Sequence, residues 1–176
     1  MRPATVAIGG VLMCLLLVAA VLVGSRGPGP LDQPDRANQR NGLLLSGPTI
    51  EAALPGLTPG QGPTVLLFVR AAPEEDVLLN WRDMLLTTMH VVLVVQEPGI
   101  TAPEPAAEAA AGAGLDVVVD ADGRLADAVH LPEPVDGGPG IGYAVVDTRG
   151  VVRYSTLDPA WPDNAFEVDT VVGATS

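Results

Sequence analysis

The positions of hydrophobic and polar residues divide the chain into three regions. The first is an uncharged, largely apolar run between Arg2 and Arg26. A stretch rich in Pro, Gly, Asn and Gln follows, and it shows little periodicity. The remainder alternates short apolar runs with amphipathic segments, as the strands and helices of one folded unit do. The sequence therefore predicts a transmembrane anchor at residues 1–26, a linker at 27–48 and a folded domain at 49–176.

The folded domain opens with a strand and a helix. Val65–Val69 is a continuous apolar run, which suits a strand that is buried on both faces. Pro73 and the three acidic residues after it predict a helix start, because proline fits the first turn and carboxylates favour the positive end of the helix dipole. The helix is expected to end at His90. Its buried face is expected at helical spacing: Val77, Leu78, Trp81, Leu85 and Thr88.

The remaining pattern predicts an α/β fold. The last two strands are separated by a turn that ends at Gly150, which is typical of a β-hairpin. Alternating strands and helices indicate one central mixed sheet flanked by helices on both faces. The expected elements are, in order, a strand at Val91–Val95, a helix beginning near Pro105, a strand at Leu115–Val119, a short helix at Arg124–His130, strands at Tyr143–Val146 and Val151–Tyr154, and a helix at Asp163–Val172.

The apolar run near the amino terminus is long enough to cross a membrane. About 20 apolar residues in a helix span a bilayer core of about 30 Å, and no charged residue lies between Arg2 and Arg26. A cleaved signal peptide has a shorter apolar core and a small-residue cleavage site, which is absent here. We therefore expect an uncleaved, single-pass membrane protein. Cys14, the only cysteine, lies inside this run and is expected to act as a small apolar side chain.

The charge balance excludes one class of partner. The chain has 21 acidic residues, nine arginines and no lysine, and its net charge is −12. Every acidic residue follows residue 30, so the region after the anchor carries this negative charge. Such a surface repels the phosphates of nucleic acids and anionic lipid head groups. Binding to nucleic acid is therefore not expected.

Motifs that suggest metal or cofactor chemistry fail on spacing. The Asp-Ala-Asp-Gly turn at 120–123 resembles part of a calcium loop, but valines occupy the first and twelfth positions of that loop. His90 and His130 have no cysteine partner and no second histidine at ligand spacing. The glycines at 138–142 precede a strand, whereas a dinucleotide loop precedes a helix. We expect no metal and no cofactor, and we identify no small-molecule ligand.

Three segments of the domain carry a resemblance to a known family. They are TVLLFV at 64–69, LDVVVDADGRLADAVHL at 115–131 and IGYAVVDTRGVVRYSTL at 141–157. In their order and spacing they resemble the membrane-tethered, thioredoxin-like redoxin proteins of bacteria, the TlpA, ResA and MauD-like group. The resemblance implies a thioredoxin-like fold.

The resemblance also implies a domain outside the cytoplasm. The count of arginines near the ends of the anchor favours the opposite orientation. A very short amino-terminal tail, however, is the usual form of an export signal that is retained as an anchor. We therefore expect an extracytoplasmic domain.

The residues that carry redox chemistry in that family are absent from this chain. The family's cysteines lie five and eight residues after the phenylalanine of the first strand, and counting from Phe68 gives Pro73 and Asp76. The family's cis-proline corresponds to Ile141 or Gly142, depending on the alignment. Thiol–disulfide exchange needs an attacking thiolate and a second thiol. Thiol redox catalysis by this chain is therefore not expected.

A fold pattern that is retained without its thiols indicates a role in binding. The degenerate turn and the loop at 132–142 are expected to lie adjacent and to form a docking surface for a protein partner. The chain would then be an accessory or assembly subunit of an envelope complex, such as a respiratory or cytochrome-maturation complex. Two alternatives stay open: a redoxin that depends on the cysteines of a partner, and an enzyme that uses non-thiol chemistry at the acidic turn 74–76. The candidate surface residues are Ala72, Pro73, Glu74, Glu75, Asp76, Ile141 and Gly142.

Overall fold

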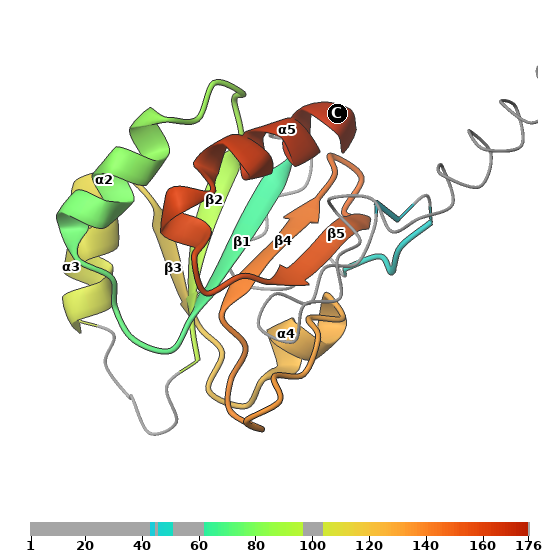
Figure 1. Ribbon diagram of the computed structural model, residues 1–176, viewed down its shortest axis with the longest axis horizontal. Helices are drawn as coiled ribbons and strands as arrows, with labels where there is room; N and C mark the ends of the chain where they lie inside the picture. The colour runs from blue at the N-terminus through green and yellow to red at the C-terminus, as the bar shows by residue number, and fades with distance from the viewer. Residues whose placement is uncertain (1–42, 45, 51–61, 97–103, 176) are drawn as a thin grey trace, which may run out of the picture.

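A computed structural model describes residues 43–44, 46–50, 62–96 and 104–175 of the chain. These residues form an α/β domain with one central sheet and helices on both of its faces (Figure 1). In this part of the chain no helix is long and apolar enough to cross a membrane. The predicted anchor at residues 1–26 lies outside the described residues.

Five strands form a mixed sheet, as the alternation of apolar runs predicted. They are β1 (Thr64–Val69), β2 (His90–Val95), β3 (Asp116–Val119), β4 (Gly142–Val146) and β5 (Val152–Leu157). Their order across the sheet is β3-β2-β1-β4-β5. The first three strands are parallel, whereas β4 runs antiparallel to both β1 and β5.

The helices cover the two faces unequally. They are α2 (Glu75–Asp83), α3 (Glu104–Ala113), α4 (Arg124–Ala128) and α5 (Ala165–Thr175), with a short 3-10 helix, η1 (Trp161–Asp163), before α5. Residues of α2, α3 and α5 share one hydrophobic cluster with one face of the sheet. The opposite face packs against α4. The prediction of helices on both faces is therefore confirmed.

β1 lies in the middle of the sheet and is buried along its whole length. Successive residues of a strand point to opposite faces, so its side chains alternate between the two hydrophobic clusters. Val65 and Leu67 pack on the side of α2, α3 and α5, whereas Leu66 and Phe68 pack on the side of α4. This explains the continuous apolar run, because neither face of the strand meets solvent.

Trp81 connects α2 to the segment before α5. Its ring contacts that of Trp161 edge to face, with the centroids 5.6 Å apart, and its indole N–H donates to the Trp161 carbonyl oxygen at 3.0 Å. With Leu78 it forms the buried part of the predicted helix face. Leu85 is partly buried and Thr88 is exposed, and both lie beyond the end of the helix.

α2 ends at Asp83, so the prediction that this helix continues to His90 is wrong. The reason is tertiary. The backbone N–H groups of Leu86 and Thr87 donate to the carboxylate of Asp169 in α5, at 2.9 and 2.6 Å, and are thereby withdrawn from helical hydrogen bonds. His90 is instead the first residue of β2.

Other boundaries shift by smaller amounts. The short helix α4 ends at Ala128 rather than His130, which adopts a left-handed φ of 54°. β5 continues to Leu157, beyond the predicted end at Tyr154. The carboxyl-terminal helix starts at Ala165 rather than Asp163, after η1, and ends at Thr175 rather than Val172.

The segment before the sheet packs on the domain. Ile50 is buried in the cluster on the α4 face, and Leu44 lies partly buried against it. Thr49 bridges to Val151, and Arg153 donates from Nε to the Leu44 carbonyl oxygen at 2.7 Å. The packed part of the domain therefore reaches back to Leu44, within the stretch predicted as linker.

Candidate functional site

The predicted docking turn follows β1 at the carboxyl edge of the parallel strands. Ala72 and the three carboxylate side chains after Pro73 are exposed. Asp76 accepts a hydrogen bond from the next backbone N–H at 3.0 Å, as an acidic residue in the first turn of a helix does. The side chain of Glu75 lies against Gly112 of α3. These contacts show that the acidic turn forms the start of α2.

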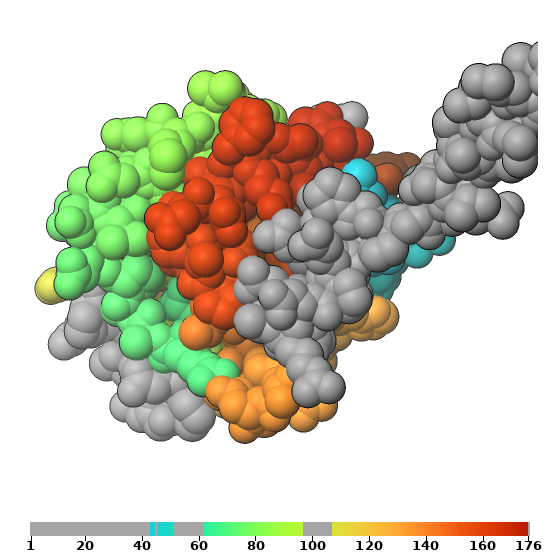
Figure 2. All heavy atoms as spheres, viewed as in Figure 1, coloured from blue at the N-terminus to red at the C-terminus, as the bar shows by residue number. Residues whose placement is uncertain are grey.

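Arg70 joins the end of β1 to the loop at 132–142. Its Nε donates to the Pro139 carbonyl oxygen at 2.6 Å, and its Nη2 pairs with the carboxylate of Asp136 at 2.9 Å. Figure 2 shows the chain after β1, in green, beside the orange atoms of this loop. Arg70, which precedes the predicted turn, thus contacts the loop at 132–142, and these contacts do not involve residues 72–76.

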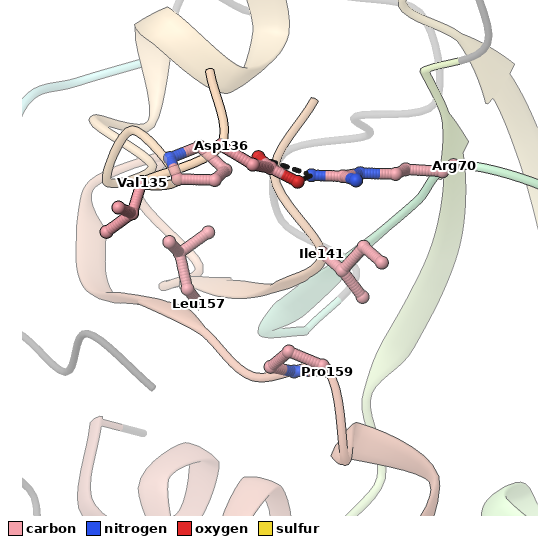
Figure 3. A pocket seen from close by; sticks show the side chains of 7 residues that line it. Arg70, Val135, Asp136, Ile141, Leu157 and Pro159 are labelled. Carbon is pink, nitrogen blue, oxygen red and sulfur yellow. Dashed lines mark hydrogen bonds and ion pairs between the residues drawn. The ribbon is translucent and has the colours of Figure 1, made fainter. Parts of the chain in front are cut away.

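A cleft of about 300 Å³ opens between this loop and the end of β5. The Arg70–Asp136 ion pair runs along one side, and Ile141 and Pro159 lie across from it (Figure 3). Of the predicted surface residues, Ile141 lines the cleft, and the turn residues do not. The lining residues are Arg70, Pro134, Val135, Asp136, Ile141, Leu157 and Pro159.

Gly142 lies behind this cleft, inside the sheet. It is buried in β4 and pairs with Phe68 of β1. A Cβ at this position would overlap the carbonyl oxygen of Thr156 in β5. Gly142 therefore allows the strands to approach closely and offers no side chain to a partner.

The wall at the end of β5 is held by Asp158, which is fully buried. Its carboxylate accepts hydrogen bonds from the Ala160 N–H at 3.0 Å and from the side-chain amide of Asn164 at 2.7 Å. Its own N–H donates to the carbonyl oxygen of Ile141 at 2.9 Å. This network fixes the two chain segments that face each other across the cleft.

The rim of the cleft combines one ion pair with exposed apolar surface. The pKa of Asp136 lies below its usual range. The main cause is the hydrogen bond from the Gly138 N–H, and the second is the hydrogen bond from the Arg70 guanidinium, so this carboxylate is charged at neutral pH. Val135, beside it, is 74% exposed. The mouth of the cleft thus presents one exposed apolar side chain beside a charged pair.

The carboxylates proposed for non-thiol chemistry face solvent. Glu74, Glu75 and Asp76 are all exposed, and none lines the cleft. A general acid or base must lie where a substrate can be held against it. The three carboxylates therefore lie apart from the cleft.

Other polar candidates have structural roles. Asp120 accepts hydrogen bonds from the backbone N–H groups of Leu125 and Ala126, at 3.0 Å each, and so supports the start of α4. His90 Nε2 lies 2.7 Å from the carboxylate of Asp116 on the neighbouring strand. Within the described residues, no group of three or more His, Cys, Asp or Glu side chains is arranged to hold a metal ion.

Sequence reasoning did not single out Arg70, Leu157 or Pro159. Arg70 is distant in the sequence from Leu157 and Pro159, and they meet only because the sheet places β1, β4 and β5 side by side. One signal was available for Arg70. It is a charged residue directly after a buried strand, at the edge where α/β sheets form their sites.

Comparison with models of protein families finds no match, and a search of curated proteins finds no significantly similar chain. The functional inference therefore rests on the residues and geometry of the chain itself.

Proposed function

We propose that this protein is a membrane-tethered, non-catalytic thioredoxin-like domain that binds a protein partner in the bacterial envelope. Residues 1–26 form the tether, and the domain lies outside the cytoplasm. The protein acts as an accessory or assembly subunit of an envelope complex, such as a respiratory or cytochrome-maturation complex. The partner occupies the cleft beside Arg70 and Val135.

The strand order supports the thioredoxin-like part of the proposal. β1 and β2 are parallel and joined through α2, and β4 and β5 form an antiparallel hairpin beside β1. α5 then returns to the face that carries α2. The resemblance to redoxin proteins implies this arrangement. β3 and α4 come from the segment at 115–131 that resembles the redoxin insertion.

The absence of thiols supports a non-catalytic role. Pro73 and Asp76 occupy the positions of the two redoxin cysteines. The only cysteine, Cys14, belongs to the predicted anchor. Without a thiolate and a resolving thiol, the domain cannot carry out disulfide exchange by itself.

The observation that carries the proposal is the cleft at this edge of the sheet. It is lined mainly by apolar side chains and is flanked by the exposed Val135. Apolar clefts of this kind accept an anchoring side chain from a partner, and such anchors supply most of the binding energy of an interface. The ion pair of Arg70 with Asp136 adds polar contacts at the rim.

The proposal is tested by placing a photo-crosslinking amino acid at Val135 in the full-length chain, in native membranes. The matched control is Phe166, which has the same exposed fraction of 74% but lies in α5 and does not line the cleft. We expect a discrete cross-linked partner from position 135 and none from position 166. Equal cross-linking from both positions, or none from either, would contradict the proposal.

A substitution checks the same surface without a cross-linker. Val135→Asp places a charge at the mouth of the cleft, and it leaves stability unchanged because the side chain is exposed. We expect the partner recovered with the protein from mild detergent to fall about tenfold or more, as at an interface anchor. Phe166→Asp should leave the recovery unchanged.

A further inference from the structure

The cleft beside Val135 opens at an edge of the sheet that carries many exposed carboxylates. Because β4 runs antiparallel to β1 and β5, the loop before β4 and the segment after β5 lie at the same edge as the carboxyl ends of β1, β2 and β3. We call this the carboxyl edge. Its exposed acidic residues are Glu74, Glu75, Asp76, Asp122, Glu133 and Asp136.

The two arginines of the carboxyl edge compensate only part of this charge. Arg70 pairs with Asp136, and Arg124 pairs with Asp122. Within the described residues, no cation pairs with Glu133 or with the three carboxylates of the turn at 74–76. The carboxyl edge therefore keeps an excess of negative charge that the domain itself does not neutralise.

The opposite edge of the sheet differs in this respect. Asp83, at the end of α2, pairs with Arg82. Asp147, in the turn between β4 and β5, pairs with both Arg149 and Arg153. Uncompensated charge thus collects at the edge that bears the cleft. Charge of one sign around a cleft raises the local concentration of oppositely charged ligands and speeds their association.

Carboxylates flank the apolar mouth of the cleft. Pro134 and Val135 line it, and Glu133 and Asp136 precede and follow them in the chain (Figure 3). Glu133 is exposed, and Arg70, the one cation of the lining, is already paired with Asp136. A group that fits this surface therefore combines an apolar centre with positive charge on its flanks.

The volume of the cleft limits the size of that apolar centre. It is about 300 Å³, whereas pockets for small molecules and cofactors span about 300 to 1,000 Å³. This volume suits one large side chain of a partner. Most of the lining is apolar, and burial of such a side chain supplies the binding energy of an interface anchor.

We infer that the cleft receives an apolar side chain from a polypeptide segment in which arginine or lysine residues flank that side chain. The flanking cations face Glu133 and the other unpaired carboxylates of the carboxyl edge. A second copy of this chain does not fit by the same edge, because two acidic surfaces repel each other. The inference rests on the proposed function, since it specifies the chemistry of the proposed protein partner.

The test uses the full-length, ¹⁵N-labelled chain in dodecyl maltoside, an uncharged detergent, at low salt. Three acetylated and amidated peptides are titrated and followed by NMR: Arg-Arg-Leu-Arg-Arg, Arg-Arg-Ser-Arg-Arg and Glu-Glu-Leu-Glu-Glu. We expect saturable shifts of the Val135 and Ile141 backbone amides with the first peptide. The serine peptide should bind about tenfold or more weakly, because it buries no leucine side chain. The acidic peptide should not saturate.

Variants assign the charge effect to the rim of the cleft. Glu133→Gln should weaken binding of the leucine peptide a few-fold at low salt, and the difference should disappear at high salt, where exposed charges are screened. Glu108→Gln is the matched control, because it removes the same charge from an exposed position in α3, which does not line the cleft. It should leave binding unchanged.

Three results of the titration would overturn the inference. They are no saturable shift of Val135 and Ile141 with the leucine peptide, equal binding of the serine or acidic peptide, and equal weakening by Glu108→Gln and Glu133→Gln.

The native partner gives an independent check through the cross-link from position 135. The cross-linked segment of the partner is sequenced, and we expect arginine or lysine within a few residues of the cross-linked position. A discrete partner joined through an acidic segment would leave the proposed function intact and overturn this inference. Absence of any cross-linked partner would instead contradict the proposed function.

Discussion

Several aspartate side chains stabilise turns and helix ends of this domain by accepting hydrogen bonds from backbone N–H groups. Asp120 supports the start of α4, Asp158 shapes the turn after β5, and Asp169 fastens the loop after α2 to α5. Asp147 does the same for the turn between β4 and β5. A carboxylate accepts several hydrogen bonds at once. In a chain with nine arginines and 21 acidic residues, backbone N–H groups thus help to stabilise carboxylates, and Asp147 also pairs with Arg149 and Arg153.

The stabilisation that Asp147 contributes depends on pH. Burial by itself would raise the pKa of its carboxyl, but hydrogen bonds from Val151 and Arg149 outweigh burial and hold the pKa below its usual value. The folded pKa is therefore lower than the unfolded one, which is about 4. The stabilisation by Asp147 is present above the unfolded pKa and is lost as the pH falls through the folded pKa.

We expect Asp147→Asn to lower the free energy of unfolding at pH 7 by about 1–3 kcal/mol. It should also flatten the loss of stability of the domain below about pH 4. Urea unfolding across pH 2–7 measures both effects. Asp122→Asn, which changes an exposed ion pair, is the control and should stay within about 0.5 kcal/mol at pH 7. Parallel pH profiles for the wild type and Asp147→Asn would show that this carboxylate has no such role.

The central strands and the hairpin follow closely from local patterns. β1 and β2 are continuous apolar runs because both of their faces are covered, and the turn before β5 ends in Gly150, whose φ of 79° suits glycine. The end of α2 was not predictable from its own residues. It depends on Asp169, which lies far along the chain and captures the N–H groups that would have continued the helix.

The close pairing of β4 with β5 depends on Gly142, which has no side chain. We expect Gly142→Ala to lower the free energy of unfolding by about 2 kcal/mol or more, because the added methyl group overlaps the Thr156 carbonyl and forces the strands apart. Gly173→Ala in α5 is the matched control. Its methyl group meets open space, and alanine favours a helix over glycine by about 0.5–1 kcal/mol. Thermal unfolding of both variants makes the comparison, and equal effects would contradict this account of β4.

The candidate site is a product of the whole fold. Its two sides come from the end of β1, the loop before β4 and the segment after β5. Of the surface residues that the sequence predicted, Ile141 lines the cleft and the turn at 72–76 does not. The sequence did not predict which side chains form the cleft, because contacts such as that of Arg70 with Asp136 join residues far apart in the chain.

The arrangement of the complete protein in the cell is tested with single cysteines. Cys14 is the only native thiol, so Cys14→Ala yields a cysteine-free chain. Phe166→Cys then adds one exposed thiol to the domain. We expect a membrane-impermeant maleimide to label this thiol in intact spheroplasts, because the proposed orientation places the domain outside the cytoplasm. Alkaline washing should leave the protein in the membrane, and deletion of residues 1–26 should release it.

Labelling of the Phe166→Cys variant only after lysis would contradict the predicted orientation. Release of the full-length chain by alkaline washing would contradict the proposal that residues 1–26 anchor it in the membrane. The wild-type chain is a separate control, since Cys14 in the proposed anchor would lie within the lipid and should not react with the polar reagent.

The sequence by itself determined which segments are strands, that helices flank the sheet, and that the chain's one cysteine is Cys14, far from the end of β1. These properties depend on local periodicity and on residue identity. The tertiary structure decided where α2 ends, how the segment at Leu44 joins the domain, and which residues form the cleft. These properties depend on contacts between distant parts of the chain, such as that of Leu86 with Asp169 and that of Arg70 with Asp136.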